Sequence, residues 1–182
     1  MSARPPARRH RHVPVLLVVV ALLAVAADQV SKAWARHHLS GGRTVDVVGD
    51  FLRLQLIGNP GAAFSVGEGK TIVFTLLAAV FVILIAIVAP RVTSRVWALA
   101  LGLIWGGAAG NLIDRLIRPP AFARGRVTDF IAYSHWFIGN VADIAIALGA
   151  VILVIAAIRG VGPGLVRRRS GGARRPQKRA GA

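Results

Sequence analysis

The sequence predicts an all-α membrane protein with four transmembrane helices and a small β-sheet lying on the outer membrane surface. Three observations lead to this prediction. Hydrophobic residues make up 55% of the 182 residues, which is more apolar surface than a soluble domain of this size can bury. Four apolar stretches have about the 20 residues that a helix needs to cross a bilayer. One connection between them alternates apolar and polar side chains, as a half-buried strand does.

The four spans belong to one predicted membrane domain, residues 1–160. They cover about residues 13–35, 71–89, 96–117 and 137–158. Residues 161–182 are rich in Arg, Gly and Pro, and we expect a disordered, basic cytoplasmic tail there. Alternatively, the first stretch is a cleavable secretory signal, because Ala24-Val25-Ala26 resembles the small-residue cleavage site of such signals. Polar residues that carry a motif follow directly, which favours a retained helix.

The distribution of positive charge predicts the topology. The formal net charge is +16, and such a charge alone would suggest nucleic-acid binding. The Lys and Arg residues gather instead at both ends of the chain and in the short connection 90–95. Because cytoplasmic loops are enriched in these residues, we expect both termini and this connection in the cytoplasm, and no nucleic-acid partner. The connections 36–70 and 118–136 then face outside. Three arginines in the second connection oppose the rule, namely Arg118, Arg124 and Arg126.

The first outer connection contains the predicted sheet. Residues 44–57 read TVDVVGDFLRLQLI, and from Phe51 onward polar or aromatic side chains alternate with leucines. A period of two places the leucines on one face of a strand. This apolar face would rest on the membrane surface.

Four of the seven acidic residues lie in or beside the predicted spans: Asp28, Asp114, Asp129 and Asp143. Since neighbouring spans run in opposite directions, a rise of 1.5 Å per residue brings all four carboxylates to the outer leaflet. A carboxylate at membrane depth is costly and indicates a function unless a basic partner explains it. Asp129 has only Arg126 nearby, and Asp143 has no basic residue within a helical turn. These two are the candidate functional pair.

The other two carboxylates have a structural interpretation. Lys32 follows Asp28 by one helical turn, on the same face of the helix. Arg115 follows Asp114 directly. We therefore expect Asp28, Lys32 and Asp114 to support the site rather than to act in it. Arg115 could brace the third helix through Asp114 or contact a substrate.

Five short motifs occur along the spans and their outer connections. They are residues 28–32 (DQVSK), 59–65 (NPGAAFS), 106–115 (GGAAGNLIDR), 127–131 (VTDFI) and 140–143 (NVAD). In this order, over about residues 13–158, they resemble the lipoprotein signal peptidase (signal peptidase II) family. The glycines of the third motif suit a close approach of helices. The residues before Asn140, Phe137-Ile138-Gly139, and Ile144 depart from the family pattern without replacing a carboxylate.

The resemblance implies a membrane aspartic endopeptidase that removes the signal peptide from bacterial prolipoproteins, cutting just before the diacylglyceryl-modified cysteine. Its catalytic aspartates match Asp129 and Asp143, and it needs no cofactor or metal. Its partners would be these prolipoproteins and membrane lipids. It would lie in the bacterial cell membrane and would be a monomer. The residues expected to bind substrate are Asn59, Gly61, Asn111, Arg115 and Asn140; for the asparagines, hydrogen bonding between helices or loops is an equal alternative.

Two close carboxylates sharing a proton could activate water and hold the scissile carbonyl. Three other functions remain open. Buried acids also serve proton-coupled transporters, although these tend to have internal repeats and sites at the midplane. A Ser/Lys peptidase would need Lys32 to meet Ser31 or Ser65, and adjacent helical residues do not face each other. The pair His37-His38 could suggest a metal, but adjacent histidines on a helix diverge.

Overall fold

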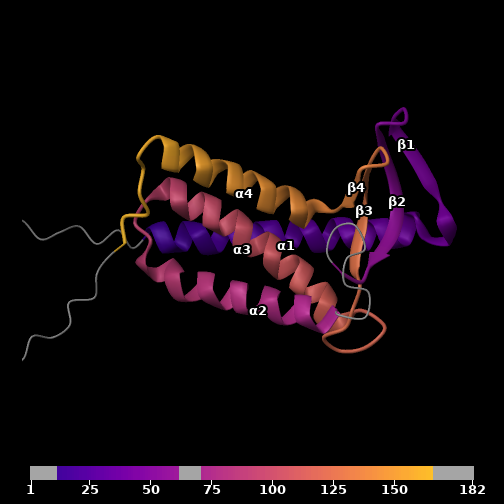
Figure 1. Ribbon diagram of the computed structural model, residues 1–182, viewed down its shortest axis with the longest axis horizontal. Helices are drawn as coiled ribbons and strands as arrows, with labels where there is room; N and C mark the ends of the chain where they lie inside the picture. Colours follow the sequence, from indigo (N-terminus) through magenta and orange to yellow (C-terminus); the bar gives the residue numbers. More distant parts are fainter. Residues whose placement is uncertain (1–11, 62–70, 166–182) are drawn as a thin grey trace, which may run out of the picture.

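The computed structural model describes residues 12–61 and 71–165 (Figure 1). The N-terminal arginines, the segment Ala62-Ala63-Phe64-Ser65, Glu68 and most of the predicted tail lie outside the described residues. Within the described part, four helices run side by side and a sheet covers one end of them, as Figure 1 shows. The described ends of the chain lie at the opposite end of the bundle.

The four helices confirm the predicted spans. They are α1 (His12–His38), α2 (Thr71–Val88), α3 (Arg95–Ile117) and α4 (Val141–Ile158). Each is long and apolar enough to cross a membrane, α2 together with the 3₁₀ turn η3 (Ala89–Arg91) that follows it. Large apolar side chains such as Leu76 and Leu77 of α2 are more than half exposed. Such a surface is suited to lipid rather than water.

The start of the fourth span differs from the prediction. Phe137–Gly139 is a short strand, β4, and α4 begins only at Val141. Asn140 is the N-cap: its side-chain oxygen accepts from the backbone N–H of Asp143, while the Asp143 carboxylate accepts from the N–H of Asn140. This reciprocal capping box satisfies two helix-end donors and fixes where the helix begins. Asp143 therefore lies in the first turn of α4 rather than six residues into a longer helix.

The sheet has four antiparallel strands in the order β1-β2-β3-β4. The predicted strand region forms β1 (Thr44–Val48) and β2 (Leu52–Asn59); the 3₁₀ turn η1 (Ser40–Gly42) precedes them. Strand β3 (Val127–Tyr133) comes from the connection 118–136, for which no secondary structure was predicted, and β4 comes from the predicted start of the fourth span. The β-branched and aromatic content of residues 127–133 is the signal that could have indicated β3.

A small apolar cluster joins the sheet to the bundle. Ala35 in the last turn of α1 and Leu39 directly after the helix pack with Phe130 of β3, and all three side chains are buried. The last turns of α1 thus extend under the sheet, as Figure 1 shows. This contact holds β3, with Asp129 next to Phe130, against the helices.

Glycines let α3 pack closely between α1 and α4, as the sequence predicted for the glycine motif. A Cβ atom on Gly106 would lie 2.5 Å from the carbonyl oxygen of Ala21 in α1. A Cβ atom on Gly107 would lie 2.5 Å from the carbonyl oxygen of Ala142 in α4. Small residues permit such backbone contact in membrane bundles. The spacing of the helices, and with it the position of Asp143, depends on these residues.

We expect Gly106→Ala to destabilise the bundle by about 1–3 kcal/mol, because the added methyl group forces α1 and α3 apart. The measurement is the unfolding midpoint of purified protein in detergent. Gly162→Ala is the matched control, since a Cβ atom there would meet nothing within 4 Å. Equal midpoints for the two variants would contradict the close-packing role.

Candidate active site

Two carboxylates approach each other from different elements at the end of the bundle beneath the sheet. Asp129 lies on β3, in register with Ile57 of β2, and its side chain is only 3% exposed. Asp143 lies in the first turn of α4. Ile57 follows an irregularity in the β2–β3 register that begins after Leu54. The two aspartates of the predicted pair are brought to a common neighbour, Asn140.

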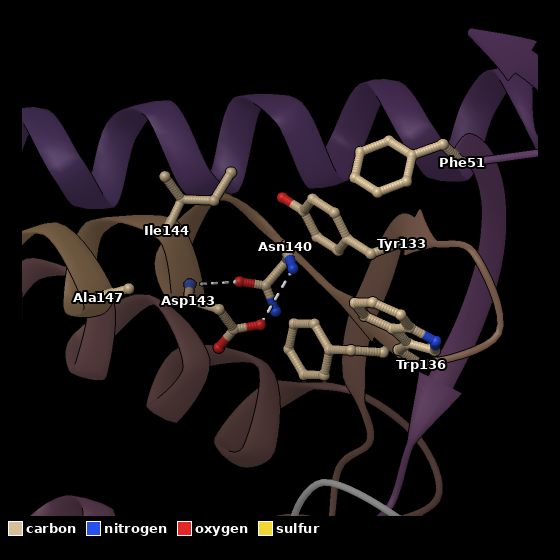
Figure 2. A pocket seen from close by; sticks show the side chains of 8 residues that line it. Phe51, Tyr133, Trp136, Asn140, Asp143, Ile144 and Ala147 are labelled. Atoms are coloured by element: carbon tan, nitrogen blue, oxygen red, sulfur yellow. Dashed lines mark hydrogen bonds between the residues drawn. The ribbon is translucent and has the colours of Figure 1, made fainter. Parts of the chain in front are cut away.

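Asn140 contacts both carboxylates. Its side-chain Nδ2 donates to Oδ1 of Asp129 over 2.6 Å, and its backbone N–H donates to Oδ2 of Asp143 over 3.0 Å. Figure 2 shows Asn140 beside Asp143 and the capping contacts between them. Asn140 is 1% exposed, so water does not compete for these bonds. One residue thus sets the relative position of the two acids.

Two further asparagines each hold one carboxylate. Asn59 donates from Nδ2 to Oδ2 of Asp129 over 2.9 Å, and Asn111 donates from Nδ2 to Oδ1 of Asp143 over 3.0 Å. Asn140 also donates to the side-chain oxygen of Asn111 over 3.1 Å. All four carboxylate oxygens therefore accept a hydrogen bond. The asparagines expected to bind substrate are placed here to orient the acids.

Burial perturbs the protonation of Asp129. Desolvation raises the pKa of its carboxyl group from 3.8 to about 6, against the hydrogen bonds from Asn59 and Asn140, which favour the ionised form. The charge of Asp143 also raises this pKa. The group consequently titrates near pH 6, well above an ordinary carboxyl group, where it can both give and take a proton.

Behind the two acids lies a buried ionic cluster of Asp28, Lys32 and Asp114, all 0% exposed. The Lys32 ammonium group is 2.9 Å from Oδ2 of Asp28 and 3.1 Å from Oδ2 of Asp114. It also donates to the side-chain oxygen of Asn111 over 2.8 Å. The hydroxyl group of Ser31 donates instead to the carbonyl oxygen of Asp28 over 2.8 Å, so Ser31 is not paired with Lys32 as a Ser/Lys peptidase would require. The supporting role expected for the three residues fits this arrangement.

The ionic cluster also holds the backbone next to each acid. Oδ1 of Asp28 accepts from the N–H of Ala142, over 3.1 Å, and Ala142 precedes Asp143. Oδ2 of Asp114 accepts from the N–H of Thr128, over 3.0 Å, and Thr128 precedes Asp129. The cluster thereby links α1 and α3 to both chain segments that carry the candidate acids.

The sequence left two roles open for Arg115, and the first of them, an ion pair with Asp114, is not formed among the described residues. Arg118, one turn further along, contacts Asp114 instead, with Nε 3.3 Å from Oδ1. Residues four apart share a helix face and adjacent ones do not. Arg115 donates from Nη2 to the carbonyl oxygen of Gly61 over 2.9 Å. Since the N–H of Gly61 donates to Oδ1 of Asn59, Arg115 fixes the turn that follows β2.

A largely apolar pocket of about 500 Å³ opens beside Asp143 (Figure 2). Side chains from the β1–β2 turn, from the β3–β4 hairpin and from α4 line it. These are Phe51, Tyr133, Trp136, Phe137, Asn140, Asp143, Ile144 and Ala147. This pocket was not predicted from the sequence, in which the aromatic residues around position 136 are its only signal.

A family model described as signal peptidase (SPase) II matches residues 20–159. The lipoprotein signal peptidase of Streptomyces coelicolor is 42% identical over 159 residues, which is 87% of this chain and 78% of that protein. The lipoprotein signal peptidase of Mycobacterium leprae is 43% identical over 159 residues, covering 87% and 77%.

Solved structures agree with the fold. A bacterial membrane enzyme determined by the in meso method at 2.3 Å resolution superposes with a TM-score of 0.70 at 25% identity, covering 84% of this chain and 93% of that one. A second such structure, at 1.9 Å resolution, gives a TM-score of 0.68 at 26% identity. The helices and the sheet are thus arranged as in an integral membrane enzyme.

Proposed function

Because the chain belongs to the signal peptidase II family, we propose that it is an aspartic endopeptidase that cleaves prolipoproteins just before the diacylglyceryl-modified cysteine. The observation that carries this proposal is the contact of Asn140 with both Asp129 and Asp143. It holds two buried carboxylates together in a membrane-spanning protein that removes signal peptides from prolipoproteins.

The pair supplies the acid and the base that peptide hydrolysis requires. Two neighbouring carboxylates resist double ionisation and share one proton. The ionised member takes a proton from the attacking water, and the protonated member donates a hydrogen bond to the scissile carbonyl. The proton taken from the water then reaches the leaving nitrogen. The asparagine donors keep both carboxylates in place through these steps, so that little reorganisation is needed.

The membrane restricts where the substrate meets this pair. We propose that both termini are cytoplasmic and that the site lies near the outer leaflet, beneath the sheet. A diacylglyceryl group keeps the scissile bond at the membrane surface, so the substrate reaches the site by lateral diffusion. The apolar pocket beside Asp143 would accept apolar groups that flank this bond. Arg115 and Gly61 border the site and would contact the substrate backbone.

The direct test is cleavage of a purified prolipoprotein by the purified protein in detergent, followed as a gel shift. One substrate carries the diacylglyceryl group and its matched control carries an unmodified cysteine. Cleavage of the modified substrate only, at the bond before the cysteine, is expected. Absence of cleavage by well-folded protein would contradict the peptidase function and would favour proton-coupled transport, which a proteoliposome assay can measure.

The pH dependence of cleavage is expected to report Asp129. With a pKa of about 6 the group is mostly protonated below pH 6 and mostly ionised above it. In Asn59→Ala the loss of a donor to the ionised form raises this pKa, by about one unit for a bond of roughly 1.4 kcal/mol. The limb of the pH profile of kcat/KM that reflects the ionisation of Asp129 should therefore move to higher pH.

Gln29→Ala is the matched control for this profile, because the hydrogen bonds described for Gln29 go to Asp28 and Gly110. Its profile should keep the wild-type limb. An unchanged limb in Asn59→Ala, or a shift to lower pH, would exclude Asp129 as the group that this limb reports.

A further inference from the structure

A second hollow, of about 240 Å³, lies near strands β2 and β3, and it brings together three arginines from separate segments. Arg36 belongs to the last turn of α1, Arg118 follows α3, and Arg126 precedes β3. The other residues that line the hollow are Leu56, Ile57, Gly58, Pro119 and Thr128. Two of these arginines are among the three that oppose the positive-inside rule in the predicted topology.

The positive charge of this hollow is only partly balanced. Arg118 contacts Asp114, which already shares Lys32 with Asp28. Arg36 has a weaker partner, the hydroxyl oxygen of Thr128 at 3.4 Å. Across residues 12–61 and 71–165, the ion pairs formed include neither Arg36 nor Arg126. The guanidinium groups of Arg36 and Arg126 therefore line the hollow with N–H donors that are available to a ligand.

The hollow lies at the level where the spans end. Arg118 comes directly after Ile117, the last residue of the third span, and the Ile117 side chain is 65% exposed. Ile57, which lines the hollow itself, is 40% exposed. Basic side chains next to exposed apolar ones, at the end of a membrane span, match the two parts of a lipid molecule.

We propose that the hollow of Arg36, Arg118 and Arg126 binds the phosphodiester group of a phospholipid from the surrounding leaflet. Guanidinium groups recognise phosphate oxygens through paired, charge-assisted hydrogen bonds. The hydroxyl group of Thr128, which also lines the hollow, adds a neutral donor. The acyl chains would then extend along the exposed apolar surface beside Ile57 and Ile117.

A lipid bound here would lie next to the strand that carries Asp129, because Thr128 is its neighbour in sequence. The proposal itself is independent of the peptidase function, since it concerns binding alone. It also gives a physical reason for arginines on a side of the membrane where the positive-inside rule disfavours them.

The test is a titration of the purified protein, in a non-ionic detergent, with short-chain dihexanoyl phosphatidylglycerol. Binding is read from the shift of the unfolding midpoint and from native mass spectrometry. Arg36→Gln and Arg126→Gln are each expected to weaken binding about tenfold, as the loss of one charge-assisted contact would. Arg124→Gln is the matched control, because Arg124 lies in the same connection but does not line the hollow.

Two further ligands separate the possible sources of affinity. Dihexanoylglycerol lacks the phosphate, so any binding of it should be the same in the arginine variants as in the wild type. Inorganic phosphate should bind far more weakly than the lipid. An equal loss in Arg124→Gln would show diffuse electrostatic attraction and overturn the assignment. If inorganic phosphate bound as tightly as the lipid, the ligand would be free phosphate rather than a phospholipid. If Arg36→Gln and Arg126→Gln bound the lipid as the wild type does, the binding site would not be this hollow.

Discussion

Asp129→Asn and Asp143→Asn are each expected to lower the cleavage of a diacylglyceryl-modified prolipoprotein by about 10³-fold or more, with the fold retained. An amide cannot exchange a proton as a carboxyl group does, so either substitution removes the acid or the base from the pair. Asn is close in size to Asp, so that the buried site is not emptied. The measurement is the single-turnover rate in detergent, which separates chemistry from product release.

The control for these variants is Asp46→Asn, because the Asp46 side chain on β1 is 65% exposed and its ion pair with Arg53 lies at the surface. This variant should cleave at the wild-type rate. Near-wild-type cleavage by Asp129→Asn or Asp143→Asn would remove that residue from the catalytic pair. The buried carboxylates Asp28 and Asp114 would then be tested next.

Lys32→Met is expected to destabilise the protein by about 3–5 kcal/mol, the cost of leaving buried charges unpaired. Lys32 lies within 3.1 Å of two carboxylates that are themselves 0% exposed. Without the ammonium group, Asp28 and Asp114 repel each other in a medium of low dielectric constant. The loss is measured as a lowered unfolding midpoint or a lowered yield of folded protein.

Two variants test whether the destabilisation expected for Lys32→Met has an electrostatic cause. Arg53→Met removes the cation of an exposed ion pair and should cost less than about 1 kcal/mol. Adding Asp28→Asn to Lys32→Met removes one of the two repelling charges, and Asp114 keeps Arg118 as a partner. The double variant should therefore be more stable than Lys32→Met alone. Equal or lower stability of the double variant would show that Lys32 acts through packing rather than charge.

The sequence alone was sufficient for the features that depend on local pattern. Four spans follow from the length of apolar runs, because a bilayer of fixed thickness demands about 20 apolar residues. The strand region 44–57 follows from its period of two. Asp129 and Asp143 stood out because a carboxylate beside a membrane span is costly without a partner. The pairing of Asp28 with Lys32 follows from their spacing of one helical turn.

Other features were decided only by the tertiary structure. Asn59 and Asp129 are 70 residues apart, and their contact depends on the register of β2 against β3. Arg118 rather than Arg115 contacts Asp114, and Phe137–Gly139 became a strand rather than the start of a helix. Local patterns indicate which side chains need a partner. They cannot say which distant segment supplies it, because that depends on how the helices pack and where the strands pair.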